Sequence, residues 1–152
     1  GARPAGLIAF DTLTLEAGAP LFGVDMDSSI NPMQAGLETK AIDFEKGCYI
    51  GQEVIAKIKY LGQINSGLAG IRIEGDSIPA PGARVVSNCE DVGALTRAAF
   101  CPTLGKVMAF GHIHRKAMAP GTGVTVRDDN LEAAGEITSL PFYLNKELEA
   151  HL

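Results

Sequence analysis

The hydrophobic pattern changes from a helical spacing to a strand-like alternation part-way along the chain. Residues 6–17 predict a short helix, because closely spaced apolar residues are followed by the helix-ending residue Gly18. A second helix is predicted directly after Gly51, since apolar residues at positions 54, 55, 58 and 61 share one helix face and Gly62 supplies a stop. Residues 41–44 alternate between apolar and polar, which favours a short strand.

From residue 68 onward the chain consists of short alternating runs that glycine and proline interrupt. The strand candidates are residues 69–73, 84–86, 92–100, 107–113, 123–126 and 132–139. Short strands at this spacing are typical of a small antiparallel barrel or sandwich. We therefore predict an α+β chain with a domain boundary near Ser66, in which a helix-containing part (residues 1–65) precedes a small antiparallel β-barrel (residues 66–152).

Composition excludes several classes of protein. The chain has 152 residues and a net charge of −5, so it lacks the basic surface expected of a nucleic-acid-binding protein. No apolar run reaches membrane-spanning length, so we expect no membrane contact. Three cysteines without paired spacing argue against a disulfide framework and a zinc site, and they favour a reducing compartment. We expect a cytoplasmic protein, or one of the mitochondrial matrix if the source is eukaryotic.

The stretch Lys46–Glu53, which reads KGCYIGQE, carries the densest candidate chemistry. Cys48 precedes the predicted second helix, whose free N–H groups and dipole point towards it, and Lys46 adds a positive charge. Both effects favour the reactive thiolate form of Cys48. The alternative is a tight turn into the helix, in which the glycines serve geometry and Cys48 is a small buried apolar group.

Other candidate residues are weaker. Glu16 lies near the C-terminal end of the first predicted helix, where the helix dipole disfavours a carboxylate, and the alternative is a solvated surface glutamate. His112 and His114 would share one face of a strand, as in a two-histidine metal clip, but no third ligand stands nearby. The alternative for both histidines is an exposed barrel strand. Cys89 and Cys101 have no basic neighbour and are interpreted as structural.

Two stretches resemble a known family. The string KGCYIGQE is similar to the signature of YgfZ-type folate-binding proteins, which are relatives of the glycine-cleavage T protein (aminomethyltransferase) and act in iron–sulfur cluster assembly or repair. Residues 11–25 resemble a second block of this family, in which a helix ends in arginine–aliphatic–glutamate–alanine–glycine. The chain has Thr14 where the family usually has this arginine. The family also closes with a small β-barrel, and the start at Gly1 is then interpreted as a truncation.

The resemblance implies that residues 1–65 are the C-terminal part of a folate-binding domain and that the cofactor is tetrahydrofolate or another folate derivative. Glu16 would accept hydrogen bonds from the N–H groups of the pterin ring. Cys48 would be the functional thiol and Lys46 would favour its thiolate. Folate-site roles would also fall to three residues of the signature, Tyr49, Gln52 and Glu53. Expected partners are folate and iron–sulfur client or assembly proteins.

Two alternatives stay open. The first is an aminomethyltransferase that moves a one-carbon unit to tetrahydrofolate, and Cys48 separates it from the iron–sulfur interpretation because the T protein lacks this cysteine. The second is a diverged homologue that binds no folate. It is favoured by Thr14, Leu61 and Ser66, which stand where the family usually carries arginines.

Overall fold

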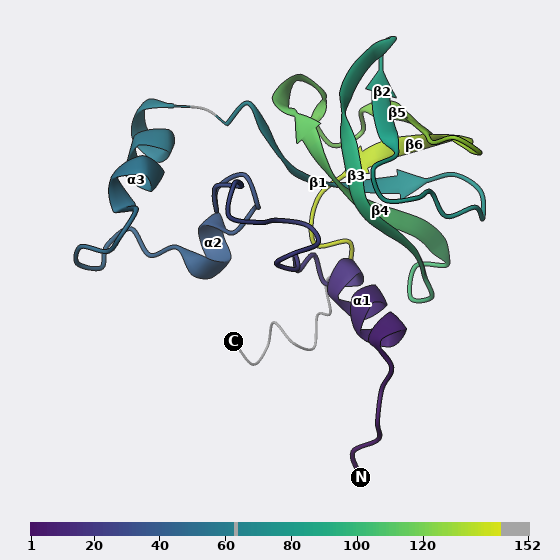
Figure 1. The fold of residues 1–152 in the computed structure, drawn as a ribbon, viewed down its shortest axis with the longest axis horizontal. Helices are drawn as coiled ribbons and strands as arrows, with labels where there is room; N and C mark the ends of the chain where they lie inside the picture. Colours follow the sequence, from purple (N-terminus) through teal and green to yellow (C-terminus); the bar gives the residue numbers. More distant parts are fainter. Residues whose placement is uncertain (63, 144–152) are drawn as a thin grey trace.

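The barrel half of the chain is a closed six-stranded antiparallel barrel with the strand order β1-β4-β3-β2-β5-β6. The computed structural model describes residues 1–62 and 64–143 (Figure 1). The strands are β1 (Ser66–Ile73), β2 (Arg84–Ser87), β3 (Glu90–Cys101), β4 (Lys106–His114), β5 (Gly123–Arg127) and β6 (Glu132–Thr138). Closure pairs β1 with β6, so the barrel has no free sheet edge. The predicted α+β class with a small antiparallel barrel is confirmed.

The barrel interior is filled by one side of each strand, as the alternation in sequence predicts. Aliphatic side chains dominate this core, which includes Ile71, Val85, Val107, Ile113 and Val126. None of these five has any exposed surface. The strand candidates of the sequence therefore correspond to the six strands of the barrel.

A second core lies between the barrel wall and the first helix, α1 (Leu7–Glu16). Leu15 packs there with Cys101 of β3 and Phe110 of β4. Figure 1 shows α1 next to these strands and α3 (Gln52–Leu61) away from the barrel, with α2 (Glu38–Ala41) between them along the chain. A short 3-10 helix, η1 (Arg115–Ala117), follows β4. No helix within the described part of the chain is long and apolar enough to cross a bilayer.

The predicted strand at residues 41–44 is wrong. The helix α2 ends at Ala41, and the next residues form no strand. The Asp43 side chain accepts hydrogen bonds from the backbone N–H groups of Glu45 (2.8 Å) and Lys46 (3.1 Å), which produces a local turn. Although β1 begins at Ser66, the division into two domains at this point stays a prediction.

Candidate functional site

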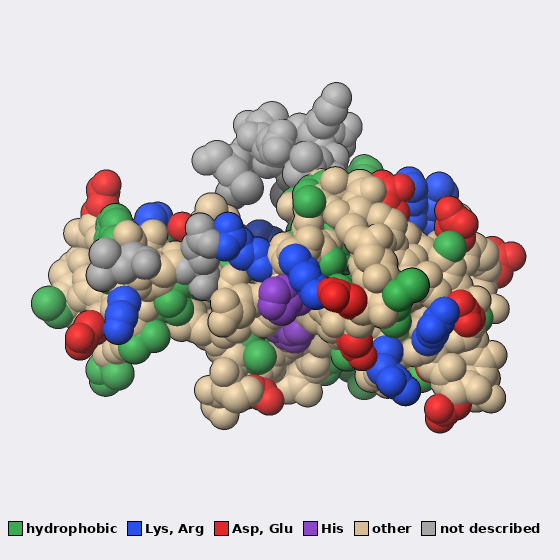
Figure 2. All heavy atoms as spheres, turned by 90° about the horizontal axis from the view of Figure 1, so that it is seen from above, with side chains coloured by type: hydrophobic (Ala, Val, Ile, Leu, Met, Phe, Trp, Pro, Cys, Tyr) green, Lys and Arg blue, Asp and Glu red, His purple; other side chains and the backbone are tan. Residues whose placement is uncertain are grey.

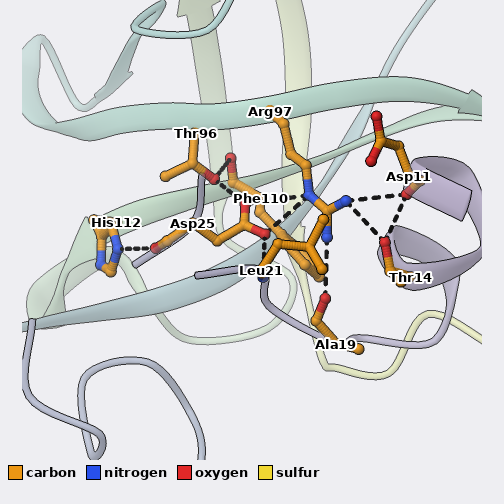
Figure 3. Close-up of polar contacts among 9 residues, drawn as sticks. All are labelled: Asp11, Thr14, Ala19, Leu21, Asp25, Thr96, Arg97, Phe110 and His112. Atoms are coloured by element: carbon orange, nitrogen blue, oxygen red, sulfur yellow. Dashed lines mark hydrogen bonds and ion pairs between the residues drawn. The ribbon is translucent and has the colours of Figure 1, made fainter. Parts of the chain in front are cut away.

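A buried ion pair joins the N-terminal segment to the barrel. Nε of Arg97 donates a hydrogen bond to Oδ1 of Asp25 (3.2 Å) and lies 3.0 Å from Oδ2 of the same carboxylate (Figure 3). Asp25 is 1% exposed and Arg97 is 9% exposed. The carboxylate also accepts from Oγ1 of Thr96 (2.6 Å) and from the backbone N–H of Leu21 (2.9 Å). The buried negative charge therefore has both a counter-charge and neutral hydrogen-bond donors.

The rest of the Arg97 guanidinium binds α1 and the segment after it. Its Nη1 donates to the backbone oxygen of Asp11 (3.0 Å) and to Oγ1 of Thr14 (3.0 Å), and its Nη2 donates to the backbone oxygen of Ala19 (3.0 Å). The group also lies 5.1 Å from the centre of the Phe110 ring. Arg97 thus uses the fork-shaped geometry of a guanidinium to connect β3 with the helix.

A β-bulge in β3 explains why two adjacent residues reach the same partner. The pairing of β3 with β4 moves from Leu95↔Gly111 to Arg97↔Phe110, which leaves Thr96 without an opposite residue. A bulge breaks the usual alternation of side chains between the two faces of a sheet. Thr96 and Arg97 therefore both contact Asp25 from neighbouring positions.

Glu16 forms a second polar connection between α1 and the barrel. Its Oε1 accepts from the backbone N–H of Thr103 (3.1 Å) and its Oε2 accepts from the Thr103 hydroxyl (2.8 Å). Because Glu16 is only 5% exposed, the alternative of a solvated surface glutamate is wrong. A carboxylate offers about four lone-pair sites, so two sites remain for further donors. The predicted pterin contact stays a prediction.

The signature loop lies in a different place. Cys48 is exposed, which excludes the alternative of a buried apolar group. Nζ of Lys46 lies 4.8 Å from the centre of the Tyr49 ring, in a cation–π contact, and Gly51 adopts φ 88° before α3 begins. Gln52 is half-buried and Glu53 is exposed in the first turn of α3. The loop sits beside α3 in Figure 1, away from α1, so the structure does not bring Glu16 and this loop together.

Each of the two histidines of β4 contacts a backbone group. Nε2 of His112 lies 2.8 Å from the backbone oxygen of Asp25, and Nδ1 of His114 accepts from the backbone N–H of Lys116 (3.3 Å). Figure 2 shows histidine side chains grouped on one face of the molecule. Across residues 1–62 and 64–143, no three His, Cys, Asp or Glu side chains are placed to hold a metal ion.

Sequence reasoning missed Asp25, Arg97 and Thr103, although it found Glu16. An available signal was Arg97 itself, which is the single charged residue between Val92 and Phe100. The sequence could not show that the counter-charge of Arg97 lies 72 residues earlier.

Cys101 is expected to make the stability of the protein depend on pH above neutrality. Burial, followed by the nearby Glu16 carboxylate, raises the pKa of the Cys101 thiol from 9.0 to about 11. Between these values the unfolded chain has lost the thiol proton and the folded chain keeps it, so the free energy of unfolding falls as pH rises. Urea denaturation at several pH values should show a shallower fall for Cys101→Ala. Cys89→Ala, at an exposed thiol, is the control; equal slopes for both variants would contradict the assignment.

Comparison with known proteins identifies the family. The sequence model of the family described as the glycine cleavage T-protein C-terminal barrel domain matches residues 47–143, which is more than half of the chain. An aminomethyltransferase of Halothermothrix orenii is 34% identical over 142 residues, covering 93% of this chain and 39% of the relative. An aminomethyltransferase of Streptomyces avermitilis is 38% identical over 147 residues, covering 94% of this chain and 39% of the relative.

A solved structure has the same fold. The crystal structure of glycine cleavage system aminomethyltransferase T from Bartonella henselae superposes with a TM-score of 0.81 at 26% identity, covering 91% of this chain and 39% of that one. The chain therefore spans about two fifths of the length of these relatives.

These findings correct the functional prediction. The interpretation as an iron–sulfur assembly or repair protein with iron–sulfur clients is wrong, because the relatives that match almost all of the chain are named aminomethyltransferases. The resemblance to the T protein is confirmed by the family match. The chain belongs to the family of the glycine cleavage T-protein C-terminal barrel domain.

Proposed function

We propose that this chain acts as the C-terminal part of an aminomethyltransferase of the glycine-cleavage kind, which transfers a one-carbon unit from a lipoyl-bound aminomethyl group to tetrahydrofolate. The observation that carries this proposal is the match of 93–94% of the chain to proteins named aminomethyltransferase. The remaining three fifths of such a protein would supply the other side of the folate site.

Glu16 is the residue of this chain that suits a pterin ring best. A carboxylate can accept two N–H donors from one ring edge, and Thr103 leaves about two of its lone-pair sites free. Its connection to Thr103 also holds the carboxylate in one position, which lowers the entropy lost on binding. The signature loop lies away from α1, so its Tyr49 ring and the polar groups of Gln52 and Glu53 at the start of α3 would meet a part of the folate other than the one that Glu16 binds.

A chimera tests the proposed function. This chain would replace the aligned segment of the Halothermothrix orenii aminomethyltransferase, and folate-dependent glycine cleavage would be measured in the reconstituted reaction. We expect activity that requires both tetrahydrofolate and the grafted segment. A chimera that folds with a cooperative melting transition but has no activity would contradict the proposal.

Glu16→Gln in the same chimera tests the folate contact. Loss of hydrogen bonds to a charged group costs about 1.5–3 kcal/mol, so we expect the affinity for tetrahydrofolate to fall by about 10- to 100-fold. Thr103→Ala is the control, because it removes the hydroxyl that binds Glu16 and keeps both the carboxylate and the backbone N–H donor at position 103. Equal losses in both variants would show that Glu16 acts only through the position of α1.

The role of Cys48 as a functional thiol is a separate proposal, because aminomethyl transfer to folate needs no protein thiol. Iodoacetamide should alkylate Cys48 faster than Cys89 at neutral pH. Both thiols are exposed, and only Cys48 has the Lys46 ammonium and a helix N-terminus nearby. Lys46→Gln should reduce the difference, as measured by mass spectrometry of quenched samples. Equal alkylation rates for the two cysteines would contradict the proposal that Cys48 is a functional thiol.

A further inference from the structure

Arg97 of the barrel contacts one side chain of α1. Nη1 of Arg97 lies 3.0 Å from Oγ1 of Thr14 (Figure 3). The guanidinium that faces position 14 thus comes from β3 of the barrel, 83 residues later in the chain.

We propose that Arg97 is a positioning residue that supplies, from the barrel, the guanidinium that holds α1 and its Glu16 in place. Its role towards folate rests on the proposed function, whereas its role towards the helix rests on the contacts alone.

The contacts show how one side chain reaches both α1 and the segment after it. The guanidinium binds α1 at the backbone of Asp11 and the hydroxyl of Thr14, and it binds the chain beyond the helix at the backbone of Ala19. On its other side it meets the Asp25 carboxylate, which is the negative group of this cluster. Glu16 lies on the same helix and binds the turn after β3, so Arg97 and Glu16 connect α1 to the barrel at two separate points.

Charge balance makes the proposal testable by moving the arginine from position 97 to position 14. The cluster has one buried carboxylate and one guanidinium, so a second guanidinium would be buried without a counter-charge. Thr14→Arg alone should therefore destabilise the protein. In an Arg97→Ser background the same substitution should stabilise it, because the new side chain can occupy the space in front of Asp25 that Arg97 leaves.

Amide hydrogen exchange supplies the local measurement. The reporters are the Ala17 N–H, which donates to Leu13 at the end of α1, and the Thr103 N–H, which donates to Glu16. Arg97→Ser should lower the protection of both by about tenfold or more relative to the β1 amide of Ile71 in the barrel core. The double variant Thr14→Arg/Arg97→Ser should recover most of the lost protection of these two amides. Arg72→Ser is the matched control, because Arg72 forms an exposed pair with Glu136.

The proposal is decided by the sign of the change in melting temperature that Thr14→Arg causes in each of the two backgrounds. If Thr14→Arg lowers the melting temperature in the wild-type background and raises it in the Arg97→Ser background, one guanidinium in front of Asp25 holds α1, and Arg97 supplies it in this chain. If Thr14→Arg has the same sign in both backgrounds, the proposal is overturned, even where Arg97→Ser alone is too unstable for exchange measurements. Titration of tetrahydrofolate against the chimera separates the proposed folate function from the positioning role of Arg97. A sign reversal without folate binding would reject the proposed function and keep the role of Arg97.

Discussion

Asp25→Ala is expected to lower the free energy of unfolding by about 3–5 kcal/mol, the usual cost of breaking a buried ion pair by removing one partner. The substitution leaves the Arg97 guanidinium buried without its counter-charge. It also removes the acceptor of the Thr96 hydroxyl and of the Leu21 N–H. Urea denaturation followed by circular dichroism would measure the change as a lower midpoint at an unchanged slope.

Glu136→Ala is the matched control for the buried pair. Glu136 pairs with Arg72 on the barrel surface at 2.7 Å, and both side chains are more than a third exposed. Exposed pairs contribute about 0–1 kcal/mol, so we expect a small change. If Asp25→Ala were as mild as Glu136→Ala, water would have to reach Arg97, and the description of this pair as buried would be wrong.

Phe110→Ala is the second substitution with a large expected effect, at about 3–5 kcal/mol. Phe110 is fully buried at the centre of the core between α1 and the barrel wall. Its ring stacks on Phe142 with 5.7 Å between ring centres, and the Arg97 guanidinium lies against it. The substitution would leave a cavity beneath the helix, and thermal denaturation of the variant would show the loss.

Phe100→Ala provides the control for aromatic truncation. Phe100 lies in β3, and 45% of its surface is exposed, so its removal should cost only about 1 kcal/mol, well below the cost for Phe110. Similar melting temperatures for Phe110→Ala and Phe100→Ala would show that the core beneath α1 contributes little to the stability of the fold.

The strands could be predicted because their signal is local. In β1, for example, Ile71 and Ile73 point into the barrel and Arg72 points out, as the alternation in the sequence indicates. The failure at residues 41–44 has an equally local cause. The Asp43 side chain binds its own backbone neighbours and replaces the hydrogen bonds of a strand, which a pattern of apolar and polar residues cannot show.

The candidate site was predictable only in part. Glu16 was found because a carboxylate at the end of a helix is out of place, and the structure shows that Thr103 binds it from 87 residues away. The Lys46–Glu53 loop was found from its composition, and its distance from α1 could not be foreseen from the sequence. Arg97 was missed because its importance depends on a bulge that turns Thr96 and Arg97 towards the same carboxylate.

The sequence by itself determined the helix at the N-terminus, the six strands and the residues that face the barrel interior, because spacing along a short segment decides which side chains share a face. Only the tertiary structure decided which charges meet: Arg97 with Asp25, and Glu16 with the turn after β3. Those partners lie far apart along the chain. Their contact depends on how the closed barrel and α1 pack against each other, and no local pattern contains that information.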